Sequence, residues 1–80
     1  MYYIQSVEYF DKKTDAEEVF DCLARQDGYK GGRILSPSVI RPAWMVQTFY
    51  EDNPEAKWLP DGCMRTFVPA SIRKSLGIQA

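Results

Sequence analysis

The sequence predicts a small α+β domain with an antiparallel sheet. Its elements in chain order are a strand, a helix, two more strands and a shorter second half. Residues 2–10 are rich in β-branched and aromatic side chains, as strands are. Residues 14–28 have a capping signal at one end and glycine at the other, which indicates a helix. Residues 44–51 are again dense in apolar side chains and predict another strand. At 80 residues the chain suffices for a single domain, 1–80, with one modest core.

The helix has the clearest pattern in the chain. Thr14 is the expected N-cap, and Glu17 three residues later completes a capping box. Gly28 is the expected residue just beyond the helix end. Apolar side chains recur with the spacing of one helix face: Ala16, Val19, Phe20, Leu23 and Ala24. We expect Phe20 and Leu23, at the centre of this stripe, to be fully buried.

The helix is followed by a pair of strands. Residues 33–36 predict a short strand, and residues 44–51 predict a longer one. Pro37 and Pro42 bound the connection between them, where neither can donate to a sheet ladder.

The last third of the chain predicts shorter elements. Asn53 and Pro54 start a helical stub that Pro60 ends after about a turn and a half. Residues 63–68 predict a fourth strand. A short helix then runs from Pro69 through Leu76 and is closed by Gly77, with Ile78 making the hydrophobic contact of the cap.

Both predicted long strands carry large apolar side chains on both faces, which a strand with one wet face does not need. One helix of about a dozen residues covers only one face of a sheet. We therefore expect the other face to be buried in a homodimer.

Composition argues against several kinds of site. The chain has no histidine, and its net charge is −1 from 10 basic and 11 acidic residues. This removes the commonest metal ligand and general base and gives no general attraction to nucleic acid or to anionic lipid. Cys22 and Cys63 are too few for a zinc site, and no apolar run reaches the ~20 residues of a membrane span. We expect a cytoplasmic protein with no metal, cofactor, nucleic-acid partner or membrane contact.

The order strand, capped helix, glycine cluster, strand, turn, strand resembles the antibiotic biosynthesis monooxygenase-like family over residues 2–52. The matching positions are Gly28, Tyr29, Gly31, Gly32, Trp44 and Glu51–Asp52. The resemblance implies a ferredoxin-like sheet with a degenerate second half and assembly as a dimeric α/β barrel. It also implies a cofactor-independent monooxygenase-like activity, in which a pocket and a polar residue activate the substrate. The Asn and His residues of haem-degrading relatives have no counterpart, since the chain lacks His and its only Asn is Asn53.

A second resemblance lies at residues 68–78, which look like the "IP..IRK.LGI" segment of swapped-hairpin DNA-binding domains. In those domains a further strand follows, whereas this sequence continues for only two residues. Proline at the start, Ile and Leu inward and glycine after the end also describe any short capped helix. A non-catalytic interaction or regulatory module, including a weak DNA-binding reading of residues 68–78, is the alternative function.

The candidate site is a pocket for an apolar or aromatic small molecule. Aromatic side chains would form its walls and isolated polar side chains would hold a polar end. The residues expected to bind the ligand are Tyr9, Arg33, Trp44, Gln47 and Trp58. The alternatives are that the aromatic side chains belong to the core or to a dimer interface, and that Gln5 and Gln47 bond each other across adjacent strands. No catalytic residue is assigned, because no nucleophile has a recognisable base.

Overall fold

A four-stranded antiparallel sheet with a helix on each face makes up the protein in a computed structural model, which describes residues 1–53 and 63–78. The elements in chain order are β1 (Tyr2–Phe10), α1 (Lys13–Leu23), β2 (Tyr29–Leu35), β3 (Trp44–Glu51), β4 (Met64–Phe67) and α2 (Ala70–Ser75). The helix predicted after Asn53 lies outside the described residues.

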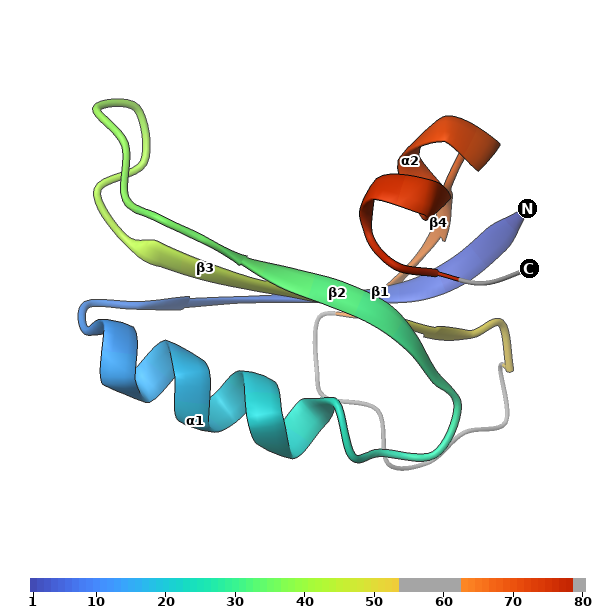
Figure 1. The fold of residues 1–80 in the computed structure, drawn as a ribbon, viewed down its shortest axis with the longest axis horizontal. Coiled ribbons are helices and arrows are strands. Elements are labelled where there is room, and N and C mark those ends of the chain that lie inside the picture. Colours follow the sequence, from blue (N-terminus) through green and yellow to red (C-terminus); the bar gives the residue numbers. More distant parts are fainter. Residues whose placement is uncertain (54–62, 79–80) are drawn as a thin grey trace.

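The strands are ordered β2-β3-β1-β4, and every neighbouring pair is antiparallel. The connection through α1 carries the chain from β1 past β3 to β2 (Figure 1). This split β-α-β arrangement is compatible with the ferredoxin-like fold expected from the sequence. The central strands β3 and β1 therefore have a neighbour on each side, whereas β2 and β4 are edges.

The face of the sheet under α1 holds the larger core. Its buried members come from β1, α1 and β3, and they are Ile4, Ala16, Leu23, Val46 and Tyr50. Strand alternation and the helical apolar stripe bring these side chains together, as the sequence predicts. Val19 and Phe20 pack against this core but stay half-buried, so the expectation of a fully buried Phe20 is wrong. Phe20 instead lies edge-on to Tyr29.

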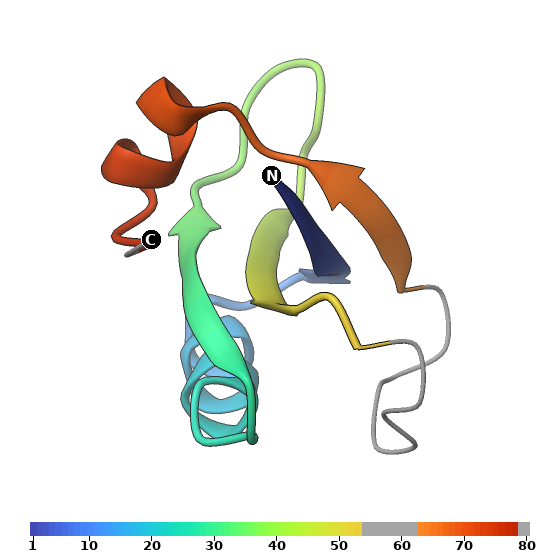
Figure 2. The same ribbon diagram turned by 90° about the vertical axis from the view of Figure 1, so that its right-hand side faces the viewer.

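The opposite face carries a second, smaller core, and α2 lies over it (Figures 1 and 2). Its members are Tyr3, Phe49, Val68, Leu76 and Ile78. The end of α2 is a Schellman cap: the Ile78 N–H donates to the Arg73 carbonyl and the Gly77 N–H to the Lys74 carbonyl. Gly77 adopts the left-handed φ of +74° that this cap requires. The predicted cap, including the buried contact of Ile78, is confirmed.

Gly31 on β2 makes room for this C-terminal segment. A Cβ at this position would lie 2.7 Å from both the Leu76 carbonyl oxygen and Ile78 Cγ1. Only glycine allows the chain after α2 to approach the sheet so closely. The glycine cluster thus fixes where residues 76–78 pack.

The N-cap prediction for α1 is wrong. The helix begins at Lys13, and the Lys12 carbonyl accepts the first helical hydrogen bond from the Ala16 N–H. Thr14 therefore lies exposed inside the first turn, and the helix has no side-chain cap. Ala16 is completely buried, so the first turn packs against the sheet although no side chain caps it.

Other boundaries shift by a few residues. The helix ends at Leu23, so Gly28, with its φ of +83°, belongs to the turn before β2 rather than to the helix cap. The predicted strand 33–36 is longer, because β2 pairs with β3 from Tyr29 onward and absorbs an irregularity between Tyr29 and Gly31. The predicted strand 63–68 is observed as β4, one residue shorter at each end.

The two α1 positions provide a stability test. Leu23→Ala should lower the free energy of unfolding by about 2–5 kcal/mol, since it empties a core position. Thr14→Ala should change it by less than about 0.5 kcal/mol, because the hydroxyl is exposed and caps nothing. Chemical denaturation measures both. A cost of about 1 kcal/mol or more for Thr14→Ala would restore the capping role that the sequence predicts.

Candidate functional site

A pocket of about 200 Å³ lies between α2 and the sheet, on the face opposite α1. Its apolar lining residues are Phe49, Phe67, Val68, Pro69, Ile72 and Leu76. Its polar lining residues are Gln5, Arg33, Gln47 and Thr66. An apolar cavity with a few convergent polar groups is the usual form of a small-molecule site.

Strand register places two of the polar side chains of the pocket, Arg33 and Gln47, next to each other. Arg33 on β2 is directly opposite Gln47 on β3, so both side chains emerge on the same face. The Arg33 Nε–H donates to Gln47 Oε1 at 2.8 Å. Gln5 pairs with Phe49 in the next register position and makes no side-chain hydrogen bond to any described residue. Gln5 and Gln47 therefore do not bond each other, which removes one alternative interpretation of these two residues.

The structure brings together two of the five predicted ligand-binding residues, Arg33 and Gln47. Tyr9 lies on the same face but does not line the pocket. It pairs with Met45 and so lies two residues further along β1 than Val7, which pairs with Gln47. Trp44 is on the α1 face, where the Lys13 ammonium lies 5.9 Å from its ring centroid. Trp58 lies outside the described residues.

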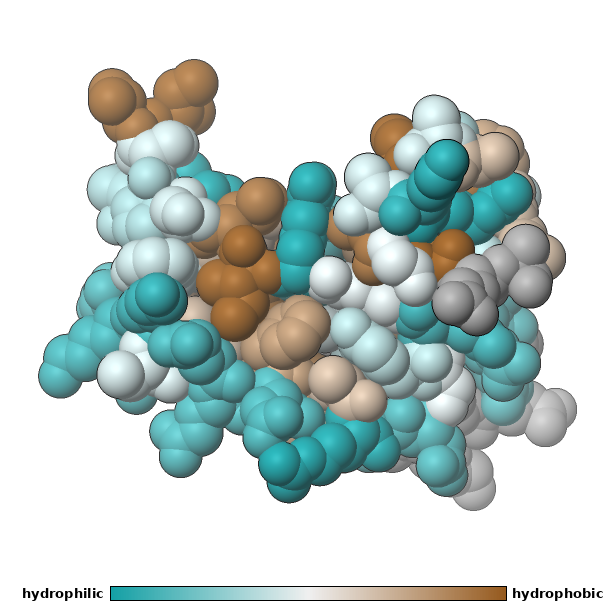
Figure 3. Space-filling model, viewed as in Figure 1, coloured by the Kyte–Doolittle hydropathy of each residue, from teal (hydrophilic) through white to brown (hydrophobic). Residues whose placement is uncertain are grey.

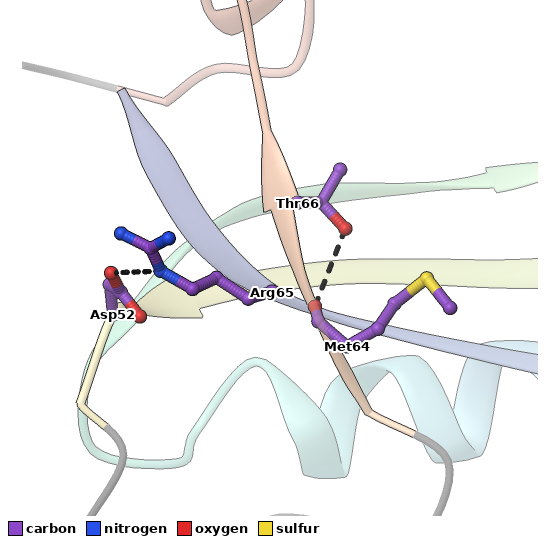
Figure 4. Close-up of polar contacts among 4 residues, drawn as sticks. All are labelled: Asp52, Met64, Arg65 and Thr66. Atoms are coloured by element: carbon purple, nitrogen blue, oxygen red, sulfur yellow. Dashed lines mark hydrogen bonds and ion pairs between the residues drawn. The ribbon is translucent and has the colours of Figure 1, made fainter.

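Arg65 on β4 does not line the pocket, because its side chain is engaged elsewhere. Its Nε–H donates to Asp52 Oδ2 at 2.8 Å, as drawn in Figure 4. Its guanidinium also lies 3.8 Å from the Tyr2 ring centroid. In the same view the Thr66 hydroxyl donates to the Met64 carbonyl along β4. Of the two, only Thr66 lines the pocket.

Helix α2 and the residues flanking it supply three lining residues that sequence reasoning missed, Pro69, Ile72 and Leu76. The others lie on β3, on β4 and just after β4, and they are Phe49, Thr66, Phe67 and Val68. The helix itself was predicted from its proline and glycine ends. Its position was not, because a six-residue helix has no pattern that says which face of which sheet it covers. The only signal was Gly31, whose missing side chain admits the segment after α2.

The described pocket lining carries no carboxylate, thiol, amine or phenol. Arginine stays protonated in proteins, and no base lies beside the Thr66 hydroxyl in the described lining. Tyr29 and Tyr50, the described residues whose pKa values are raised by burial, lie with the α1 core on the other face. This arrangement can bind and orient a molecule, but it offers no general acid or base at neutral pH.

Cation sites and covalent links are also missing from the part of the chain that the structure describes. No group of three or more acidic or cysteine side chains there is placed to hold a metal ion. Cys22 is exposed, Cys63 is half-buried, and no disulfide joins them. Neither α1 nor α2 is long and apolar enough to cross a bilayer.

The β2–β3 connection presents an apolar tip, which we define as Val39 and Ile40. Val39 is completely exposed and Ile40 is 96% exposed. The turn is held by hydrogen bonds from the Ser38 N–H to the Arg41 carbonyl and from the Arg41 N–H to the Ser38 hydroxyl. Figure 3 shows this tip, upper left, facing α2 across a hollow in the molecular surface. An ordered turn thus holds two large apolar side chains in solvent.

No protein-family model, curated protein or solved structure matches this chain. The function is therefore argued from the chain's own residues.

Burial of Tyr50 predicts a pH dependence of stability. The Tyr50 hydroxyl donates to the Leu23 carbonyl at 3.2 Å, and burial raises the pKa of this phenol above 10.0. A raised pKa in the folded state means that stability is retained below pH 10 and is lost as pH rises through the folded-state value. Thermal unfolding should therefore shift to lower temperature above pH 10.

The matched variant is Tyr50→Phe, which should lose about 1 kcal/mol at pH 7 through the missing hydrogen bond. Its stability should fall less steeply above pH 10, with the remaining slope due to Tyr29, whose pKa burial also raises. An unchanged slope in Tyr50→Phe would mean that the phenol is not buried as described.

Proposed function

We propose that this protein binds a small molecule with an apolar body and a polar end in the pocket between α2 and the sheet. The observation that carries the proposal is the composition of the pocket lining, which combines apolar residues of β3, β4, α2 and the residues flanking α2 with the polar residues Gln5, Arg33, Gln47 and Thr66. The Arg33–Gln47 bond fixes the polar groups before a ligand arrives, which lowers the ordering cost of binding.

Binding without catalysis is the form of this proposal that the lining residues favour. A monooxygenase-like reaction needs a group that removes a proton from the substrate or stabilises the developing charge. Arg33 supplies positive charge, but the described lining has no base. We therefore assign the protein to binding rather than to the oxygenase activity implied by the family resemblance.

Ligand binding is tested by adding single-ring aromatic compounds, both neutral and charged, to ¹⁵N-labelled protein. Amide shifts should change on β3, β4 and α2 around Phe49 and Ile72, and should leave α1 unaffected. Trp44 fluorescence is a poor reporter, because this ring lies on the far face.

Two variants of α2 separate the pocket from the helix surface. Ile72→Trp fills the pocket and should abolish the shifts, whereas Ser71→Trp adds the same ring to an exposed position outside the lining and should preserve them. Shifts that persist in Ile72→Trp, or a complete absence of shifts with the unmodified protein, would contradict the proposed function.

Helix α2 leaves part of the sheet face opposite α1 uncovered, and this surface suggests a second role, self-association. Helix α2 covers only one end of this face, and Tyr9 at the other end is 59% exposed. We propose a homodimer in which two such faces meet, as in a dimeric α/β barrel. The apolar tip of each protomer would pack against α2 of the other, since tip-to-tip contact would hold the sheets apart.

The energy of this association is of the right order. Burying a Val or Ile side chain stabilises by about 1.5–3 kcal/mol, so two tips in a symmetric dimer supply ~6–12 kcal/mol. Association costs an estimated 4–15 kcal/mol, and the sheet faces bury further apolar area. A normal interface of roughly 800 Å² per partner is consistent with the size of one sheet face.

Sedimentation at micromolar concentration should show a dimer. Replacing both tip residues, Val39→Asp and Ile40→Asp, should give a folded monomer, because charge at the interface is not buried without a partner. Cys22→Asp places one negative charge on the exposed side of α1 and should leave the dimer intact. A monomeric unmodified protein at this concentration would refute the dimer.

A further inference from the structure

We infer that the pocket selects a monocyclic anion, namely a single apolar ring that bears one carboxylate. This inference rests on the proposed function and specifies its ligand class. It follows from the volume of the pocket and from the hydrogen-bond donors of Arg33 and Gln47 that line it.

Volume limits the ligand to one ring. An apolar cavity of about 150 Å³ is large enough for benzene, whereas pockets for drug-sized molecules measure about 300–1,000 Å³. At about 200 Å³ this pocket exceeds the first value and falls short of the second. The remaining ~50 Å³ is more than the ~30 Å³ that one water molecule occupies in the liquid, and it suits a substituent the size of a carboxylate.

Arg33 and Gln47 present hydrogen-bond donors to the pocket. Because the Arg33 Nε–H donates to Gln47, the oxygen of that amide must face the guanidinium. The Gln47 NH₂ group then points away from Arg33 as a free donor. Both terminal nitrogens of Arg33 are donors as well, and neither bonds to a described residue. An acceptor-only group such as a carboxylate satisfies this set of donors, and arginine binds it with two parallel hydrogen bonds.

Charge points the same way. None of the ion pairs among residues 1–53 and 63–78 includes Arg33. Among the described residues no acidic side chain lines the pocket to neutralise it. The described lining therefore carries one positive charge without an acidic partner beside apolar side chains, and an anionic ring gains an attraction there that a neutral or cationic ring does not.

The experiment compares benzoate with benzamide, which has the same ring and almost the same shape but no charge. Titration calorimetry on the full chain should show benzoate binding ~10-fold or more tightly, as expected for hydrogen bonds to a charged group. The preference should shrink as salt is raised, because Arg33 is exposed to solvent. The two-ring anion 2-naphthoate should bind more weakly than benzoate.

Variants assign the preference to Arg33. Arg33→Gln should bring benzoate down to the affinity of benzamide, while Arg33→Lys keeps the charge but not the bond to Gln47 and should retain part of the preference. The control is Arg25→Gln, an exposed arginine of the turn after α1, which should change nothing. Circular dichroism verifies that each variant is folded.

The outcomes separate the two proposals. Equal binding of benzoate and benzamide would overturn the anion preference and leave the proposed binding function standing. Tighter binding of 2-naphthoate would overturn the size limit in the same way. If no single-ring compound binds, the proposed function fails and the anion inference fails with it.

Discussion

The fold is governed by two central strands, β1 and β3, that carry large side chains on both faces. Ile4 and Tyr50 pack beneath α1, while Tyr3 and Phe49 face the other way. Each of these strands is hydrogen-bonded to a neighbour on both sides, so its orientation in the sheet is fixed and its apolar side chains remain on both faces. Both faces therefore need cover, and a chain of 80 residues has little material with which to provide it.

The two faces receive unequal cover. The eleven-residue helix α1 spans one face and completes the larger core. The six-residue helix α2 and the residues after it cover only one end of the other face. Gly31 lets that segment lie close to β2, so even this partial cover depends on one missing side chain. What α2 leaves open becomes the pocket and the exposed surface around Tyr9.

The candidate site is a consequence of this incomplete cover. Gln5, Arg33, Gln47 and Thr66 are polar residues on the face that also carries Tyr3 and Phe49, and they line the pocket beside α2. Deep burial of unpaired polar groups would be costly, and next to an open pocket they can meet a ligand or water. The resemblance to monooxygenase-like proteins concerns the order of strand, helix and hairpin. The described pocket residues themselves provide hydrogen-bond donors and no base.

Local patterns in the sequence determined the elements. The density of β-branched, aromatic and other apolar side chains placed β1 and β3 at their observed bounds. Helical apolar spacing identified the face of α1 that packs on the sheet, since this pattern follows from helix geometry alone. The proline and glycine around α2 predicted its cap. Arg33 and Gln47 were both predicted to bind the ligand, and strand register makes them hydrogen-bonded neighbours, which the sequence alone did not predict.

Only the tertiary structure decided what depends on contacts between distant segments. Helix α1 begins at Lys13 rather than after Thr14, and its first turn packs Ala16 against the sheet although no side chain caps it. Trp44 faces α1 and not the pocket, because a strand with apolar side chains on both faces does not reveal which face meets which helix. The position of α2 was likewise decided by long-range packing, since a helix of two turns carries too short a pattern to specify its partner. The sequence determined the elements and the polar residues, and packing decided which of them share a site.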